Sequence, residues 1–392
     1  MGQQKKKERR KGKKEKLSEK RRKRRRKKKM NSLVADALKY GGPSSLPEVV
    51  GKNFTPAKVK ITVVGVGGGG TNTVSRLHKM GVESANTIAV NTDQKHLQVC
   101  EADKKILIGA QLTKGLGAGG FPEVGMKAAE QARDKFAEVL KDSELVFITA
   151  GMGGGTGTGA APVIADVAKK NGAIVVAMVT FPFALERARL EKADWGLDAL
   201  RESCDTVVII DNNRLVSYVP NLPMNQAFAV ADTLVARSVK GIADTVMLPS
   251  LMNIDFADLR MIMERAGIAM ISIGEGSGTN KVQSAIDTTL EHPLLDVDYA
   301  GAKGALVLVN GGPSMTLGEA VKIGEGITDT FDPHAYVKWG ARINPELGDK
   351  IIVTSIVTGV NSPQVLGHDS RVKGGVVAAQ AEAWKGIGAM SF

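Results

Sequence analysis

The stretch Gly151-Met-Gly-Gly-Gly-Thr-Gly-Thr-Gly159 decides how this chain is organised. The apolar run Leu145–Ala150 precedes it and a segment with helical periodicity follows, so we expect a strand, a glycine turn and a helix. Glycines let the backbone approach a ligand closely, and the N–H groups at a helix start bind phosphate. Five glycines and two threonines within Gly153–Gly159 exceed what a tight turn requires. The stretch therefore predicts a phosphate-binding loop, with a merely flexible loop as the alternative.

Two further glycine turns stand in the same kind of setting. The apolar run Val59–Val64 leads into Gly65–Asn72, and a short predicted strand at 105–108 comes shortly before Gly115–Gly120. Strands that alternate with helices indicate a parallel sheet, which binds ligands at the carboxyl ends of its strands. Gly65–Asn72 fits the G-x-G-x-x-G fingerprint, so an NAD-binding oxidoreductase is one alternative. Three glycine loops at one edge suit a triphosphate better than a single pyrophosphate.

Composition excludes several classes of protein. The 392 residues are enough for two domains. No apolar run reaches the roughly 18 residues of a membrane span, and the charged start lacks the apolar region of a signal peptide. Cys100 and Cys204 are the only cysteines and have no metal-ligand spacing. We expect both to be inert core residues of a protein in a reducing cytoplasm.

The charge is concentrated at one end of the chain. Residues 1–29 hold 19 lysines and arginines against three glutamates, a net charge of +16. Because the whole chain carries +12, the remainder carries −4. We expect residues 1–30 to form a disordered basic tail that binds anionic lipid or nucleic acid non-specifically, or merely keeps the protein in solution.

The glycine loops, taken together, resemble those of the tubulin/FtsZ superfamily. Gly153–Gly159 looks like its signature loop, and the other nucleotide loops resemble, in the same order, Gly65–Asn72, Asn91–Asp93 and Gly115–Gly120. The similarity to its FtsZ branch covers about residues 58–360, and Glu186–Asp194 and Asp211–Arg214 look closest to archaeal members.

The resemblance implies an α/β fold in which a parallel-sheet, Rossmann-like GTPase domain is joined by a long core helix to a second, smaller α/β domain. The expected boundaries are a short helix and linker at 31–57, the GTP-binding domain at 58–222, the core helix at 223–241, the C-terminal domain at 242–360 and a tail at 361–392. In the GTP-binding domain we expect a single helix from Pro122 to about Leu140. In the second domain we expect strands at 268–273, 304–310, 336–343 and 350–358, and helices at 279–291 and 316–328.

The same resemblance implies that the glycine loops and the strand end near Asn91 bind GTP or GDP with Mg²⁺. The residues assigned to this task are Gly67, Gly68, Gly69, Gly70, Thr71, Asn72, Asn91, Asp93, Gly117, Ala118, Gly119, Gly153, Gly154, Gly155, Thr156, Gly157 and Thr158. Glu186 and Arg189 would contact the ribose and phosphate region. Their spacing is three where the family has four, and either could be a solvated helix charge.

The base-binding residues are expected on the long helix. Phe228 and Asp232 are four residues apart and therefore share a helix face. Phe228 can stack on a purine, although an aromatic core residue is the alternative. The Asp232 carboxylate can accept from the two adjacent guanine donors, N1–H and N2–H, a pair that adenine lacks. Asn212 is a second candidate contact to the base.

Two acidic residues, Asp255 and Asp258, precede or begin a predicted helix that ends at Ala266. By local rules, Asn253 or Asp255 caps this helix and Asp258 lies in its first turn, where negative charge is favourable. Asn253–Asp258 also looks like the FtsZ loop that enters the nucleotide pocket of the next subunit. The resemblance then implies that Asp255 and Asp258 are catalytic and orient a water for attack on the γ-phosphate.

The resemblance as a whole implies a GTPase that forms head-to-tail filaments in cell division, in the cytoplasm at the division site. The C-terminal segment Gly386–Phe392 could bind a membrane adaptor, or be a disordered terminus. The alternatives are a nucleotide-dependent tubulin-like scaffold for cell shape and the NAD-dependent oxidoreductase.

Overall fold

The computed structural model describes residues 59–82, 84–247, 255–266, 269–291, 297–362 and 365–367. The chain divides into two units, 1–57 and 58–392, of which only the second contains described residues. The predictions for the basic tail, the linker at 31–57, Asn253 and the C-terminal segment beyond residue 367 lie outside the described residues.

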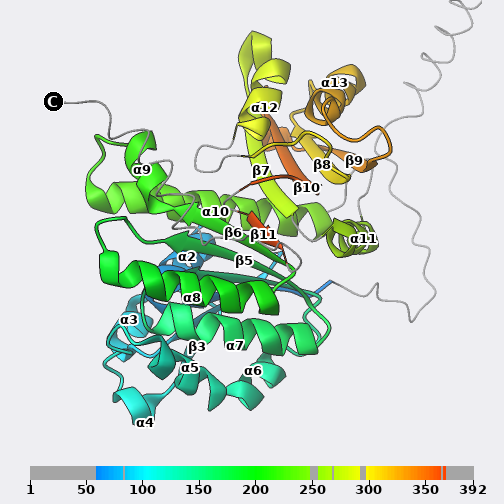
Figure 1. The fold of residues 1–392 in the computed structure, drawn as a ribbon. Coiled ribbons are helices and arrows are strands. Elements are labelled where there is room, and N and C mark those ends of the chain that lie inside the picture. Colours follow the sequence, from blue (N-terminus) through cyan, green and yellow to red (C-terminus); the bar gives the residue numbers. More distant parts are fainter. Residues whose placement is uncertain are drawn as a thin grey trace, which may run out of the picture. The chain divides into compact units, whose positions relative to one another are not determined.

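A seven-stranded sheet forms the first half of the fold (Figure 1). Its strand order is β11-β6-β5-β4-β1-β2-β3, and all neighbouring pairs are parallel except β11 with β6. The strands are β1 (Ile61–Val66), β2 (Asn86–Asn91), β3 (Lys104–Leu107), β4 (Leu145–Gly151), β5 (Ile174–Phe181), β6 (Thr206–Asp211) and β11 (Val365–Gly367).

Helices cover both faces of this sheet, as the strand sequences require. β1, β4 and β6 are apolar and buried along nearly their whole length, which is typical of parallel strands. Alternate residues feed two cores: Val64 and Val146 pack beneath the helices α5 to α8, whereas Val63 and Phe147 pack with α2 and α10. The helices are α2 (Gly67–Lys79), α3 (Gln94–Val99), α4 (Ala110–Thr113), α5 (Pro122–Glu130), α6 (Arg133–Val139), α7 (Thr156–Lys170), α8 (Arg187–Ser203), α9 (Asn212–Tyr218) and α10 (Met224–Met247).

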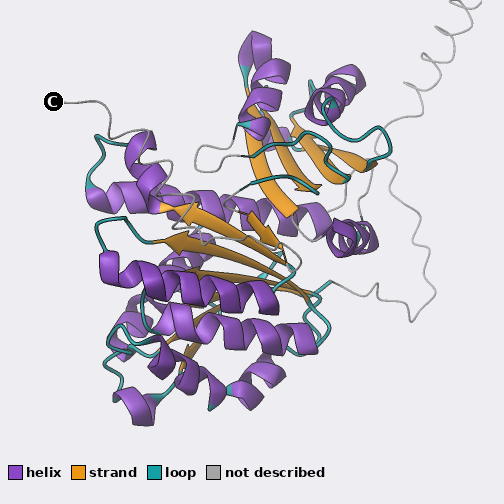
Figure 2. Ribbon diagram, viewed as in Figure 1, coloured by secondary structure: helices purple, strands orange, loops and turns teal. Residues whose placement is uncertain are grey.

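The second domain has a four-stranded mixed sheet in the order β7-β10-β8-β9 (Figure 2). Its elements are α11 (Phe256–Ala266), β7 (Ala269–Gly276), α12 (Lys281–Leu290), β8 (Gly304–Gly311), α13 (Leu317–Thr328), β9 (Tyr336–Ile343) and β10 (Ile351–Thr358), with short 3-10 helices at Gly278–Asn280 and Pro345–Leu347. One continuous apolar core contains residues of α10 and of this sheet, such as Val239 and Leu306. The strands and helices predicted for this domain are confirmed to within a few residues.

The core helix, β11 and the segment 122–140 differ from the sequence predictions, and the short helices α3, α4 and α9 were not predicted. The core helix does not stop at Gly241 but runs to Met247, because Gly241 provides room for Ile273 and Thr354 rather than a helix end. β11 adds an antiparallel edge strand within the segment that we assigned to the C-terminal tail. The single helix expected from Pro122 to about Leu140 is two helices, α5 and α6, separated by residues 131–132.

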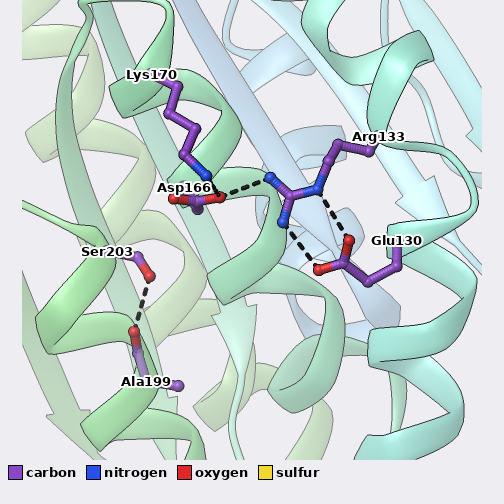
Figure 3. A network of polar contacts seen from close by, with 6 residues as sticks. All are labelled: Glu130, Arg133, Asp166, Lys170, Ala199 and Ser203. Carbon is purple, nitrogen blue, oxygen red and sulfur yellow. Dashed lines mark hydrogen bonds and ion pairs between the residues drawn. The ribbon is translucent and has the colours of Figure 1, made fainter.

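A charge network spans the break between α5 and α6 (Figure 3). Arg133 at the start of α6 forms two hydrogen bonds of 2.9 Å with the Glu130 carboxylate and one of 2.6 Å with Asp166 of α7. Lys170 binds the same Asp166 oxygen at 2.8 Å. The Arg133 guanidinium holds the pKa of the Glu130 carboxyl below its usual range. The break is therefore held by contacts to a third helix, which local periodicity does not reveal.

Cys100 and Cys204 are both buried and unpaired, as expected for core residues. Burial raises the pKa of the Cys204 thiol, which keeps it protonated and unreactive. Among the described helices, none is both long enough and apolar enough to cross a membrane.

Candidate functional site

A cavity of about 530 Å³ lies where the carboxyl ends of the central strands meet the glycine loops. The strand register explains this position: Val66 of β1 is level with Ala150 of β4, and Gly151 of β4 is level with Thr180 of β5. Because parallel strands end at one edge, the segments that follow them converge there. All residues that line the cavity lie between Gly68 and Val235, on the first domain and α10.

The signature glycine stretch forms part of the cavity wall. Gly154, Gly155, Thr156 and Gly157 line it, and α7 starts at Thr156, so the first N–H groups of a 15-residue helix lie at the cavity wall. The Thr156 and Thr92 hydroxyls are 2.6 Å apart and join this stretch to the loop after β2. Such a helix start is suited to phosphate.

The loop after β2 and the third glycine turn form an adjoining wall. Asn91, Asp93, Gly117 and Ala118 line the cavity. The side chains of Asn91 and Asp93 also support the loop itself, because Asn91 Oδ1 accepts from the N–H of Thr92 at 2.9 Å and Asp93 caps α3. The Gly117 N–H donates to the Thr92 carbonyl at 3.2 Å, which ties the two loops together.

Gly68, Gly69 and Asn72 of the first glycine turn line the cavity. Six other predicted nucleotide residues do not line it: Gly67, Gly70, Thr71, Gly119, Gly153 and Thr158. A Cβ at Gly70 would lie 2.0 Å from the Thr149 carbonyl oxygen, so this glycine permits close packing of α2 on β4. Thr71 donates its hydroxyl to the Gly67 carbonyl at 2.8 Å. Gly70 and Thr71 therefore support the backbone of this turn and do not line the cavity.

Glu186 and Arg189 both line the cavity at the start of α8 and form an ion pair with each other. Glu186 Oε2 also accepts from the N–H of Phe183 at 3.0 Å, and Arg189 Nε donates to the Gly153 carbonyl at 3.3 Å. The spacing of three therefore brings both side chains to the cavity, and their contact with a nucleotide stays a prediction.

Aromatic and amide groups also line the cavity. The rings of Phe183 and Phe228 are 5.9 Å apart at an interplanar angle of 63°. Phe228 is 38% exposed, so it is not a core residue, and one ring face can meet a base. Asn212 is buried, and among the described residues its Oδ1 has no hydrogen-bond partner. A buried acceptor without a partner is costly unless a ligand supplies the donor.

Asp232 lies beside this aromatic pair, one turn after Phe228. Thr73 of α2 donates its hydroxyl to Asp232 Oδ1 at 2.8 Å. Burial raises the pKa of the Asp232 carboxyl above its ordinary value, while the Thr73 hydrogen bond and the charge of Arg76 oppose this shift. A half-buried carboxylate with one oxygen held in place can accept adjacent N–H groups from a purine edge.

Sequence reasoning missed several cavity residues. Thr73, His96, Thr180 and Phe183 line the cavity with chemistry-bearing or aromatic side chains. Phe183 follows the end of β5, so an aromatic residue at the carboxyl end of a predicted parallel strand was an available signal. Thr73 contacts Asp232 across 159 residues of sequence, and no local pattern indicates such a contact.

The two predicted catalytic acids belong to the second domain and do not line the cavity of their own subunit. Asp255 Oδ1 accepts from the N–H of Asp258 at 2.8 Å, so Asp255 caps α11 as its local sequence predicts. Asp258 is in the first turn of α11, and its Oδ1 is 3.0 Å from the ammonium nitrogen of Lys338 on β9. The described residues contain no group of three or more His, Cys, Asp or Glu side chains that could hold a metal ion.

Two family domains match this chain. The GTPase domain of the tubulin/FtsZ family matches residues 60–220, and the C-terminal domain of the FtsZ family matches residues 267–361. Cell division protein FtsZ 2 of Methanocaldococcus jannaschii is 58% identical over 319 residues, which are 81% of this chain and 84% of that protein. Cell division protein FtsZ 2 of Haloferax volcanii is 53% identical over 80% of this chain and 78% of its own length.

Solved structures agree with these matches. The structure of an empty FtsZ dimer from M. jannaschii is 43% identical, has a TM-score of 0.72, and is matched over 81% of this chain and 94% of its own. A GTPγS-bound protofilament of CetZ2 from H. volcanii is 22% identical with a TM-score of 0.67, over 84% of this chain and 100% of its own, and shows the fold alone.

Proposed function

The chain belongs to the tubulin/FtsZ family, and from this premise we propose that it is a cell-division GTPase that assembles into filaments and hydrolyses GTP where two subunits meet. The proposal rests on one observation: the cavity and the two acidic residues lie on different domains. The nucleotide cavity lies on the first domain and α10, whereas the acidic start of α11 belongs to the second domain.

In this proposal the triphosphate binds to the backbone N–H groups of Gly68, Gly69 and the start of α7, and the base lies against Phe228. Guanine N1–H and N2–H donate to Asp232, and the free Asn212 oxygen accepts a further hydrogen bond from the nucleotide. Mg²⁺ would enter bound to the phosphates, since charge neutralisation is the chemistry that it supplies in phosphoryl transfer. Backbone and helix-start donors provide the rest of the positioning.

Hydrolysis requires a group that receives the proton of the attacking water. We assign this to Asp258 of the neighbouring subunit, with Asp255 holding the helix start that presents it. As the water oxygen bonds to the γ-phosphorus, Asp258 takes its proton and the bond to the β,γ-bridging oxygen breaks. The electron pair of that bond leaves with GDP, and phosphate is the second product.

An interface that joins two different surfaces does not close on itself and therefore propagates a filament. We propose a head-to-tail homopolymer in the cytoplasm, located near the membrane at the division site. The C-terminal tail would bind a membrane adaptor, and the basic segment 1–29 would add affinity for anionic lipid or nucleic acid.

Two other functions fit the chain less well. A cell-shape scaffold of the same superfamily shares the fold, but the relatives at 53–58% identity are cell-division proteins. An NAD-dependent oxidoreductase would leave the Gly153–Gly159 stretch without a task, and a GTPase-domain match covers the fingerprint on which that alternative relied.

The proposal is tested by GTP turnover at increasing protein concentration. We expect the rate per subunit to rise steeply above a threshold, because the active centre is completed only by assembly. Asp258→Ala should reduce turnover by at least about 100-fold, the scale of general-base catalysis. GTP affinity, measured by calorimetry below the threshold, should be unchanged. A rate per subunit that is independent of concentration would contradict the proposal.

A further inference from the structure

The Asp258–Lys338 ion pair joins the proposed catalytic acid to the second sheet. Lys338 Nζ lies 3.0 Å from Asp258 Oδ1, and only 13% of the Asp258 side chain is exposed, against 43% of Lys338. The hydrogen bond to Asp258 raises the pKa of Lys338, so the ammonium stays charged at neutral pH. The two residues are 80 positions apart, and neither belongs to the nucleotide cavity of its own subunit.

The two acids at the start of α11 are held in different ways. Asp255 is exposed and accepts from the Asp258 N–H, whereas the Asp258 carboxylate faces Lys338. The start of α11 therefore presents two carboxylates and one paired ammonium. A triphosphate is strongly anionic, and like charges within a few ångströms in a partly dry interface repel each other far more than in water.

We propose, on the basis of the proposed interface hydrolysis, that Lys338 is a positioning residue for catalysis between subunits. It fixes the Asp258 carboxylate through Oδ1, so that Oδ2 is the oxygen turned to the water. It also cancels one negative charge, which allows the start of α11 to approach the neighbour's triphosphate. Lys338 stays protonated throughout and transfers no proton.

Three variants separate these effects, together with a matched control. Lys338→Gln removes the charge, Lys338→Arg keeps it, and Lys338→Gln combined with Asp258→Asn restores the balance of charge. The control is Lys322→Gln on α13, an exposed lysine with no ion pair described in this structure. Assembly is measured by sedimentation with a slowly hydrolysed GTP analogue, and turnover with GTP at equal amounts of polymer.

We expect Lys338→Gln to bind GTP normally as a monomer but to need about tenfold more protein for assembly. This difference from the unmodified protein should shrink as salt rises, because repulsion between charges is screened. Turnover per assembled subunit should fall about tenfold, the scale of a lost orienting contact, and Lys338→Arg should recover most of it. The double variant should assemble like the unmodified protein and yet hydrolyse no GTP. The control should match the unmodified protein in both assays.

Two outcomes would overturn the inference while leaving interface hydrolysis intact. In one, Lys338→Gln assembles and turns over GTP like the unmodified protein, although Asp258→Ala is inactive. In the other, the double variant assembles as poorly as Lys338→Gln, which would mean that Lys338 only maintains the domain. Thermal unfolding of each variant identifies a folding defect. If turnover does not depend on protein concentration at all, the proposed function fails before the role of Lys338 is in question.

Discussion

In the proposed function, Asp232 connects the choice of base to the loops that would bind the phosphates. Its carboxylate accepts a hydrogen bond from the Thr73 hydroxyl, and Thr73 lies on α2, whose residues Gly68 and Gly69 line the cavity. Burial raises the pKa of the Asp232 carboxyl, so the group is protonated at a higher pH than an exposed aspartate. Guanine donors need the ionised form. GTP binding should therefore weaken on acidification, as the pH falls through this raised pKa.

We predict that Asp232→Asn changes the base preference of the cavity. The amide replaces one acceptor by a donor, which opposes guanine N2–H but suits the carbonyl oxygen at position 2 of xanthine. GTP affinity should fall by about 100-fold, the scale of one or two hydrogen bonds to a charged group, and XTP should bind more tightly than GTP. Calorimetry with both nucleotides checks this.

Thr73→Val is the matched control for this prediction. It removes the donor to Asp232 but keeps the carboxylate, so GTP should bind less tightly without any gain for XTP. If Asp232→Asn bound GTP as well as the unmodified protein, and the affinity did not change with pH, Asp232 would not read the base.

Cavity residues that are close in sequence could be predicted from their spacing. Residues that are distant in sequence and come together only on folding could not. The i, i+4 spacing was enough to put Phe228 and Asp232 on one face, and both line the cavity. Nothing in the sequence separates a glycine that lines the cavity, such as Gly68, from one that packs closely on a strand, such as Gly70. Both carry no Cβ, and only their surroundings differ.

At the scale of elements, glycines decide how closely α5 and α7 pack. A Cβ at Gly159 of α7 would lie 1.9 Å from the Pro122 carbonyl oxygen, and one at Gly125 of α5 would lie 2.4 Å from the Gly155 carbonyl oxygen. Both obstacles are backbone atoms and cannot rotate away. The start of α7, which lines the cavity, is therefore fixed by contact with α5.

We predict opposite effects for two glycine-to-alanine changes in helices. Gly159→Ala should destabilise the protein by about 1–3 kcal/mol, the cost of overpacking, and should also weaken GTP binding by displacing α7. Gly324→Ala in α13 meets nothing within 4 Å, so the gain in helix propensity should stabilise by about 0.5–1 kcal/mol. Chemical denaturation of both variants measures the two changes. A stabilised Gly159→Ala would contradict the packing argument.

The same scale explains which elements the sequence predicts. The alternation of apolar runs, glycine turns and amphipathic segments was sufficient for every strand of the two sheets except β11 and for most helices, because each signal is local. The break between α5 and α6 was not predictable, since it is held by Arg133 reaching Asp166 on α7 (Figure 3). β11 is only three residues long and exists through its pairing with β6, so no periodicity indicates it.

At the scale of the whole molecule, each subunit in the proposed filament contributes to two different active centres. It offers a nucleotide cavity from the first domain and α10, and an acidic helix start from the second domain. Because the contact is heterologous, the cavity of one subunit and the Asp258 that serves it come from different copies. Two inactive variants with defects on opposite surfaces should therefore restore activity to each other.

We predict such complementation between Asp258→Ala, which binds GTP but offers no acid, and Asp232→Asn, which prefers XTP but keeps Asp258. Supplied with both nucleotides, neither variant alone should hydrolyse GTP efficiently. In an equal mixture, about a quarter of the contacts in a random filament join a GTP-loaded cavity to an intact Asp258. GTP turnover in the mixture should thus reach about a quarter of that of the unmodified protein. Mixing Asp258→Ala with a variant that carries both changes should restore nothing, because no subunit then has the acid. If the first mixture formed joint filaments, seen by co-sedimentation, and still released no phosphate from GTP, the active centre would not be shared between subunits.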